Sequence, residues 1–260
     1  MHGRPKLTLD EPAEGVARLT IDNPDRRGAL DHELLDALAG HARTLDARCL
    51  VIRGTGAVFS AGYDIGNLED AEFEESAERL VAHPFHDAIE ALEAYEYPVV
   101  GEINGHAIGG GLELALTCDI RVAARTARFA MPPAKLGLIY SHTGLRKFVD
   151  VCGPANTAEL FHVGEAVDAE RALAMGLVNE AVDPGELEGR VLELASRIAA
   201  NAPLSLAGNK RVIRTLRTQP LPREVERELI ELRESCFRSE DFREGVRAFA
   251  EKRKPRWQGR

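Results

Sequence analysis

The chain of 260 residues contains only four cysteines, and none of them belongs to a C-x-x-C pair. Their spacing excludes a zinc ribbon and a disulfide framework, so we expect reduced and mostly buried thiols. No apolar run approaches the ~20 residues that cross a bilayer, which argues against an integral membrane protein. The first ten residues, MHGRPKLTLD, lack the apolar core of a signal peptide, and we expect a cytoplasmic protein.

Basic residues are in the minority, with 33 Lys and Arg against 42 Asp and Glu and a formal net charge of −9. This balance argues against a nucleic-acid partner, because binding the phosphate backbone requires an excess of positive charge. No group of His, Cys and carboxylate residues has the spacing of metal ligands, and we expect no metal. Hydrophobic residues make up 44% of the chain, as in globular proteins with a buried core.

Nucleotide-binding motifs are incomplete. Gly54-Thr55-Gly56 follows a predicted strand, but the third glycine of G-x-G-x-x-G would be at position 59, where the chain has Phe59. No G-K-[ST] sequence is present for a phosphate-binding loop. The sequence therefore gives no support for a bound dinucleotide or nucleoside triphosphate.

Strand and helix patterns alternate in the first half of the chain. Val16 to Ile21 alternates with the two-residue period of a strand, and Leu30 to Leu45 has apolar residues at helical spacing. From about Thr143 the pattern is largely helical apart from one short strand, and the last sixty residues are helical throughout. This predicts an α/β core over residues 1–200 and a helical region over residues 201–260. Further strands are expected at 49–52, 98–103, 120–124 and 177–182, and further helices at 70–95 and 111–118.

The segment Asn104 to Asp119, NGHAIGGGLELALTCD, places three glycines where a predicted strand turns into a helix. Glycine lets backbone N–H groups approach a ligand closely. These N–H groups are also the unpaired donors at the positive end of the helix dipole, which suits an oxygen that becomes negative during a reaction. The alternative interpretation is that the glycines only allow close packing of helix against strand.

A second glycine-containing loop, Val58 to Ile65 (VFSAGYDI), follows a predicted strand and offers another backbone donor. Together the two loops resemble those of the crotonase (enoyl-CoA hydratase/isomerase) superfamily. The resemblance extends over most of the chain, through matching blocks in the same order. These blocks are RRGALDHELLDAL, FSAGYDI, PVVGEINGHAIGGGLELALTCDIRVAA, FAMPPAKLGL, ERALAMGLVNEAV and EGVRAFAEKRKPRW.

The resemblance implies a spiral of β-β-α turns followed by a C-terminal helical region that forms trimers. It implies a homotrimer or a dimer of trimers that acts on an acyl-CoA thioester and needs no cofactor, since CoA is part of the substrate. The thioester enolate would be held between the backbone N–H groups of Tyr63 and Gly110. The residues that the resemblance assigns to CoA binding are Arg27, Ala29, Ala61, Ile65, Phe249 and Lys252.

Two glutamates perform the chemistry in the hydratases of this superfamily. The first matches Glu113, but the second falls on Pro133, which can neither give nor accept a proton. The block from Phe129 to Tyr140, FAMPPAKLGLIY, is similar to the methylmalonyl-CoA decarboxylase branch, in which the tyrosine points into the acyl pocket. The resemblance thus predicts an acyl-CoA lyase that decarboxylates a small malonyl-type thioester such as methylmalonyl-CoA, with Tyr140 orienting the carboxylate.

Two other functions are compatible with the sequence. The first is an enoyl-CoA hydratase or isomerase that uses Glu113 with a substitute acid. The second is a non-catalytic scaffold or an RNA-binding homologue, against which the acidic charge and the two glycine loops argue. Ser141 and His142 follow Tyr140 and could relay the proton that quenches an enolate, or could belong to a surface loop.

Overall fold

The computed structural model describes most of the chain from residue 6 onward. The N-terminal part of the protein is continuous apart from two gaps, and the description after residue 217 is restricted to short pieces. The described residues are 6–64, 84–136, 140–217, 222–225, 227, 228, 231, 239–241, 244, 248, 251 and 253–260.

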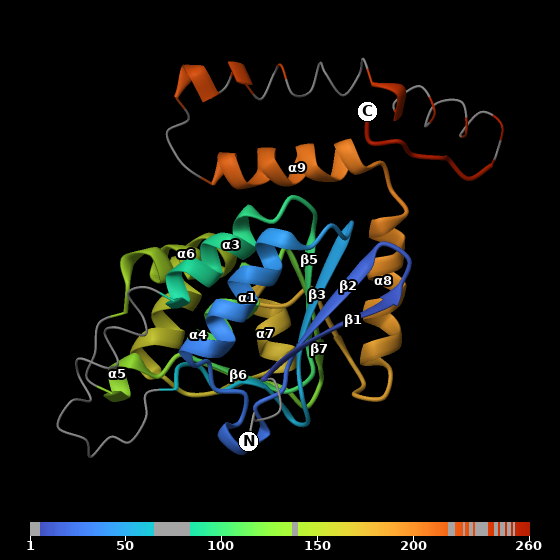
Figure 1. Cartoon of the computed structure of the whole chain (residues 1–260). Helices are drawn as coiled ribbons and strands as arrows, with labels where there is room; N and C mark the ends of the chain where they lie inside the picture. The colour runs from blue at the N-terminus through green and yellow to red at the C-terminus, as the bar shows by residue number, and fades with distance from the viewer. Residues whose placement is uncertain are drawn as a thin grey trace.

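The larger sheet of the described residues has six strands in the order β1-β2-β3-β5-β7-β10. Strands β1 and β2 form an antiparallel pair, and all following neighbours are parallel (Figure 1). The β2 residues alternate between the two faces, as the sequence predicts. The strands are β1 Leu7–Ala13, β2 Val16–Ile21, β3 Cys49–Gly54, β5 Val99–Ile103, β7 Ile120–Ala124 and β10 Glu180–Val182.

A second, smaller sheet in the described part has the order β4-β6-β8-β9. Each of β3, β5 and β7 in the larger sheet is followed directly by a short strand of the smaller sheet and then by helical structure. The chain therefore repeats a β-β-α turn, which confirms the fold expected from the resemblance. The short strands are β4 Val58–Ser60, β6 His106–Ile108, β8 Arg128–Ala130 and β9 Val167–Asp168.

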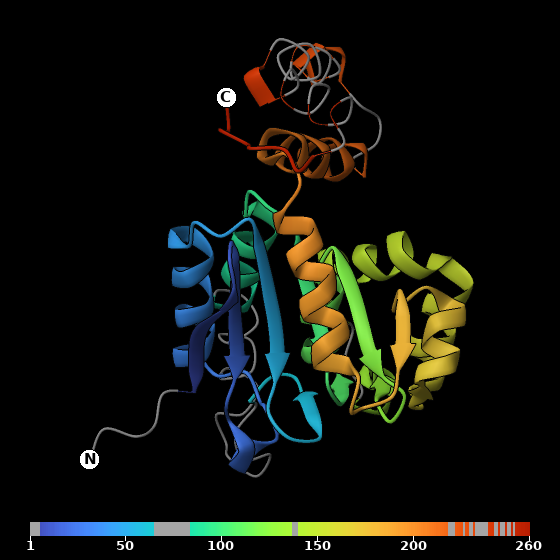
Figure 2. The same cartoon turned by 90° about the vertical axis from the view of Figure 1, so that its right-hand side faces the viewer.

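Helices cover both faces of the larger sheet (Figure 2). Helices α1 and α3 pack on one face, where Leu19, Ile52 and Ile103 point into the main core. Helix α8 covers the other face, against Val51 and Val100. The helices of the described core are α1 His32–Thr44, α3 His86–Ala94, α4 Gly110–Thr117, α5 Pro133–Leu136, α6 His142–Ala158, α7 Ala169–Met175 and α8 Leu187–Ala199.

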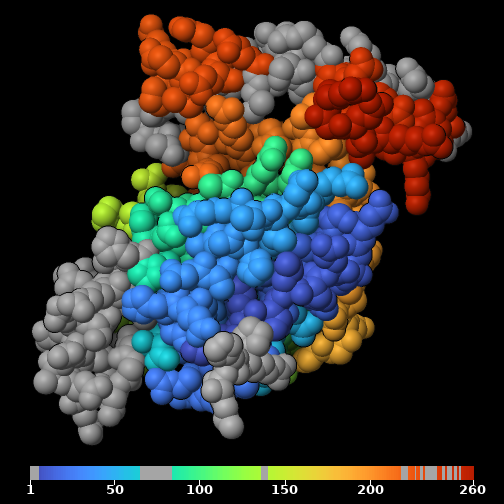
Figure 3. All heavy atoms as spheres, in the orientation of Figure 1, coloured from blue at the N-terminus to red at the C-terminus, as the bar shows by residue number. Residues whose placement is uncertain are grey.

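Helix α9 (Pro203–Leu216) lies across one end of the core, and the described pieces of the C-terminal region lie beyond it (Figure 3). Lys210 fixes this helix, because its Nζ lies 2.9 Å from Asp119 and donates to the carbonyl of Tyr97 at 2.8 Å. The division at residues 200 and 201 and the formation of trimers stay predictions. Among the described residues, no helix is long and apolar enough to cross a membrane.

Most of the predicted elements are confirmed to within a few residues, and three expectations need correction. The predicted helix over 70–95 is a helix over His86–Ala94, while residues 70–83 lie outside the described part. The predicted strand over 177–182 begins at Glu180, because Gly176 in the left-handed conformation first ends α7. The loop expected at 58–65 begins as strand β4, which pairs with β6.

Candidate active site

The three glycines at the start of α4 form the tight turn that the sequence predicts. Gly109 has φ of 55°, a conformation that favours glycine, and its N–H donates to the carbonyl of Ala130 at 2.9 Å. A Cβ on Gly111 would lie 2.3 Å from the carbonyl oxygen of Ser60, so this residue also allows the close packing of helix against strand. The first helical N–H groups, including that of Gly110, have no partner within the helix.

The Tyr63 segment lies beside this helix start. Leu30 N–H donates to the carbonyl of Gly62 at 2.8 Å, and Asp64 N–H donates to the carbonyl of Leu30 at 2.9 Å. In such a bridge the intervening Tyr63 directs its own N–H to the opposite side. A Cβ on Gly62 would lie 3.1 Å from the nitrogen of Gly110, so the two loops predicted to hold the enolate oxygen are in contact.

Glu113 lies in the first turn of α4 and is buried, with an exposed fraction of 5%. Burial raises the pKa of this carboxyl above its ordinary value, while the hydrogen bond from Tyr140 acts to lower it. The first turn of α6 packs against it, since a Cβ on Gly144 would lie 3.0 Å from Oε2 of Glu113. A buried carboxyl beside the predicted oxyanion donors is suited to proton transfer.

Tyr140 and Tyr63 form a hydrogen-bonded chain with Glu113. The hydroxyl of Tyr140 donates to Oε2 of Glu113 at 2.5 Å, and the hydroxyl of Tyr63 lies 3.0 Å from that of Tyr140. Burial raises the pKa of both phenols, and the nearby Glu113 raises them further, so both side chains are neutral donors. The structure therefore brings the side chains of all three predicted residues into one cluster.

Aromatic rings surround this cluster. Phe85 meets the ring of Tyr63 edge to face, with centroids 4.7 Å apart, and Phe161 meets Tyr140 in the same manner at 5.6 Å. These contacts fix the positions of both phenol rings.

The structure brings together three of the residues predicted to bind CoA. Arg27 ends a short 3-10 helix with φ of 53°, and its carbonyl accepts a hydrogen bond from the N–H of Ala61 at 3.1 Å. Ala29 is buried in the same turn, and its carbonyl accepts from the side chain of Asn23 at 2.9 Å. The other three predicted residues, Ile65, Phe249 and Lys252, lie outside the described residues.

Pro133 and the two residues after Tyr140 lie outside this cluster. Pro133 is buried at the start of α5. Ser141 caps α6 by accepting a hydrogen bond from the N–H of Gly144 at 3.1 Å. His142 is exposed and lines a different cavity, so the suggested proton relay through Ser141 and His142 lacks support.

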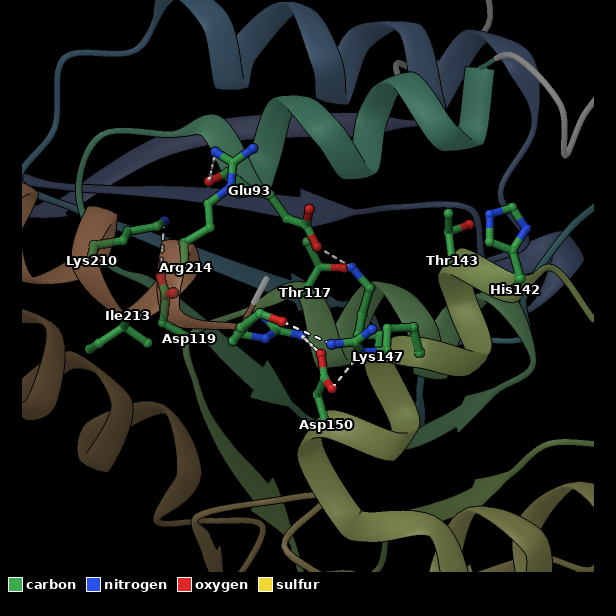
Figure 4. Close-up of a pocket in the computed structure, with 12 residues that line it drawn as sticks. Glu93, Thr117, Asp119, His142, Thr143, Lys147, Asp150, Lys210, Ile213 and Arg214 are labelled. Atoms are coloured by element: carbon green, nitrogen blue, oxygen red, sulfur yellow. Dashed lines mark hydrogen bonds and ion pairs between the residues drawn. The ribbon is translucent and has the colours of Figure 1, made fainter. Parts of the chain in front are cut away.

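That cavity has a volume of about 620 Å³ and lies between α4, α6 and α9 (Figure 4). Charged side chains dominate its lining, and most of them pair with one another. Lys147, which is nearly buried, forms an ion pair with Glu93, and Arg146 bonds Asp150 at 2.9 Å. The cavity walls are therefore held together by ion pairs, and two of the wall residues act on the pKa of Glu113, which Lys147 lowers and Glu93 raises.

Sequence reasoning missed the side-chain role of Tyr63 and the aromatic partners Phe85 and Phe161. The sequence predicts that Tyr63 contributes its backbone N–H and that its side chain is free to shape the pocket, but it does not predict a hydrogen bond to Tyr140. No local pattern relates these residues, because Tyr63 and Tyr140 are 77 positions apart. The block FAMPPAKLGLIY was the one signal that pointed to Tyr140.

Comparison with protein families gives a match over residues 11–260 to the family described as enoyl-CoA hydratase/isomerase. A protein of Bacillus subtilis (strain 168) named "Probable enoyl-CoA hydratase" is 34% identical over 249 residues, which cover 94% of this chain and 95% of that protein. The carnitinyl-CoA dehydratase of Escherichia coli (strain K12) is 33% identical over 258 residues, with the same coverage of each chain.

Comparison with solved structures also gives matches over nearly the whole chain. An enoyl-CoA hydratase from Bacillus anthracis superposes with a TM-score of 0.89 at 26% identity, covering 98% of this chain and 100% of that one. DspI from Pseudomonas aeruginosa superposes with a TM-score of 0.87 at 34% identity, covering 99% and 98%. None of these names refers to decarboxylation.

Proposed function

Because the chain belongs to the enoyl-CoA hydratase/isomerase family, we propose that it adds water to the double bond of an enoyl-CoA thioester, or removes water in the reverse direction. The names of the relatives from Bacillus subtilis and Escherichia coli, a hydratase and a dehydratase, support this reaction class. This proposal replaces decarboxylation as the leading function and adopts what the sequence offered as its alternative.

In this proposal the N–H groups of Tyr63 and Gly110 hold the thioester oxygen. Addition of water to the β-carbon places negative charge on that oxygen, and donors that are fixed in advance stabilise it without reorganising. The contact between the Gly62 and Gly110 backbones supports this role. Removal of one such donor typically raises the barrier by about 3–4 kcal/mol.

Glu113 acts as the general base toward water. The single observation that carries the proposal is the short hydrogen bond from the Tyr140 hydroxyl to the Glu113 carboxylate. It occupies one acceptor site of the carboxylate and leaves further sites, including one on Oε2 itself, free to take a proton from water. Pro133 occupies the position of the second glutamate of the hydratases. We assign part of the role of that glutamate to Tyr140.

Decarboxylation of a malonyl-type thioester is the competing function, since Tyr140 was expected to orient the departing carboxylate. In the structure, however, Tyr140 gives its hydroxyl hydrogen to Glu113. A substrate carboxylate bonded to Tyr140 would lie beside Glu113, and an ionised Glu113 would repel it. The arrangement therefore favours an uncharged acyl group.

The proposal also covers binding and assembly. Arg27, Ala29 and Ala61 would contact the CoA part of the substrate, and the helical region after residue 200 would hold a homotrimer or a dimer of trimers. No cofactor is required by this reaction, because water is the second reactant. A cytoplasmic location and independence of metals stay predictions.

Incubation of the protein with crotonyl-CoA and with methylmalonyl-CoA, followed by mass spectrometry of the products, tests the proposal. We expect a gain of one water with crotonyl-CoA and no loss of CO₂ from methylmalonyl-CoA. Glu113→Gln should abolish hydration, whereas the exposed variant Glu90→Gln should retain it. Loss of CO₂ without hydration would replace the proposal by the decarboxylase function.

A further inference from the structure

The hydrogen bonds of the Tyr63–Tyr140–Glu113 chain have a fixed direction. A phenol has one hydroxyl hydrogen, and that of Tyr140 is given to the Glu113 carboxylate. The contact of 3.0 Å between the two hydroxyls must therefore be a donation from Tyr63 to Tyr140. Once Glu113 is protonated on Oε2 it becomes the donor, and the same chain then directs the hydroxyl hydrogen of Tyr63 outward.

The position of Tyr63 places the end of this chain beside the predicted thioester site. Its ring covers the first residue of α4, since a Cβ on Gly110 would lie 2.6 Å from the ring. Phe85 holds the same ring from another side. The side chain is therefore fixed next to the two backbone groups that would hold the enolate oxygen.

We propose that the Tyr63 hydroxyl delivers the proton to the α-carbon, so that Tyr63 and Tyr140 together replace the missing second carboxylate. This inference rests on the proposed hydration and deepens it, because it assigns the acid that the reaction requires. Pro133 is unable to provide a proton, and His142 faces a different cavity. In the starting state each tyrosine gives its hydrogen toward Glu113. After Glu113 has taken up a proton the direction of the chain reverses, which leaves Tyr63 as its terminal donor.

The proton transfers balance over one turnover. The oxygen of water bonds to the β-carbon, one water proton passes to Glu113, and the electrons of the double bond form the enolate. The enolate α-carbon takes the proton of Tyr63, Tyr63 recovers one from Tyr140, and Tyr140 recovers one from Glu113. One water is added, and each of the three side chains returns to its starting state.

Exchange of the α-hydrogen for deuterium tests the proton transfer by Tyr63 in a substrate that has no double bond to hydrate. Butyryl-CoA is incubated with the protein in D₂O, and incorporation of deuterium is measured by mass spectrometry. Tyr63→Phe keeps the ring and removes only the hydroxyl, and we expect it to slow exchange by about 100-fold or more, the usual contribution of a positioned acid. Tyr95→Phe is the matched control, because its buried hydroxyl bonds Ala47 far from the site.

The double variant Tyr63→Phe/Tyr140→Phe shows whether the two hydroxyls act as one proton-transfer chain or independently of each other. Residues that act as one unit are strongly non-additive, so we expect the double variant to be about as slow as the slower single variant. Melting temperature and affinity for CoA, measured on each variant, should match those of the unmodified protein. A loss of affinity with an unchanged rate at saturation would assign Tyr63 to packing and overturn the inference.

The outcomes separate this inference from the proposed function. If crotonyl-CoA is not hydrated but Tyr63→Phe slows exchange, the hydration proposal fails and the proton chain stands. If Tyr63→Phe exchanges within about twofold of the unmodified protein, the chain is overturned while hydration is unaffected. Absence of exchange in the unmodified protein overturns the inference as well.

Discussion

The hydroxyl of Tyr140 donates a hydrogen bond of 2.5 Å to Oε2 of Glu113, a length typical of hydroxyl donors to a carboxylate. Glu113 lies in the first turn of α4, whereas Tyr140 directly precedes the cap of α6. The position of the buried carboxylate thus depends on how the beginning of α6 packs against α4. Four predictions follow from this site and from the sheet beneath it, beginning with this hydrogen bond.

Tyr140→Phe should lower the rate of crotonyl-CoA hydration by roughly 10- to 100-fold, since a hydrogen bond to a charged group is worth about 1.5–3 kcal/mol. Steady-state kinetics gives the value. Tyr97→Phe is the control, because Tyr97 lies by the ends of α1 and α3. Equal rates for Tyr140→Phe and the unmodified protein would show that Tyr140 only packs.

The pH profile should report the environment of Glu113. Burial raises its pKa, so the acidic limb of kcat/KM should lie above the range of an exposed glutamate. The Tyr140 hydrogen bond favours the carboxylate and lowers that pKa, so Tyr140→Phe should move the limb to higher pH. A limb that moves to lower pH in this variant would contradict the assignment of Glu113 as the base.

Glu102→Gln should stabilise the protein at neutral pH by about 1 kcal/mol, because Oε2 of Glu102 is buried without a partner among the described residues. Burial raises the pKa of Glu102 above its ordinary 4.5. The folded state then holds its proton more tightly than the unfolded chain, so stability falls as pH rises from about 4.5 through the raised pKa. Urea unfolding at pH 4 and pH 7 should show the gain at pH 7 only.

The other oxygen of Glu102 lies 3.2 Å from the guanidinium of Arg53, which also lies 3.4 Å from Glu188. Glu188→Gln, at the second carboxylate beside this arginine, serves as a control in which the change in stability should have the opposite sign. Hydrogen bonding to Arg18 lowers the pKa of Glu188, so its ionised form stabilises the folded state above the ordinary pKa. Its loss should destabilise the protein at neutral pH and have little effect in acid. Parallel behaviour of the two variants would refute the explanation given for Glu102.

Gly110→Ala should reduce activity, because the new methyl group would meet the ring of Tyr63 at 2.6 Å. The ring is unable to move freely, since Phe85 and Tyr140 hold it. Gly40→Ala in α1 is the matched control, since no atom lies within 4 Å of its added methyl group. There the substitution should raise stability by about 1 kcal/mol through helix propensity, and unchanged hydration by Gly110→Ala would contradict the contact.

The glycine-rich turn into α4 could be predicted from the sequence, because the residues that form it are contiguous. The pairing of the two loops could be predicted only from the resemblance to the family, because the loops are far apart in the chain. The short strands β4, β6 and β8 could not be recognised as a repeat, since each has only three residues and shows no usable periodicity. Strand β10 starts later than predicted because a glycine cap, which the hydrophobic pattern does not reveal, intervenes.

The side-chain geometry of the site was beyond sequence reasoning. That Tyr140 would donate to Glu113 rather than to a substrate depends on rotamers and on the packing of α6 against α4. The partnership of Tyr63 with Tyr140 likewise arises only when the β-β-α turns stack. For this reason the family was predicted correctly, whereas the decarboxylase branch received no support from the comparisons.

The contact between Gly110 and the ring of Tyr63 also restricts the order in which the two positions can change during evolution. An alanine at position 110 is compatible with this backbone only after residue 63 has become small. A homologue that retains tyrosine at position 63 should therefore retain glycine at position 110. Where both positions have changed, the change at residue 63 should have preceded the change at residue 110.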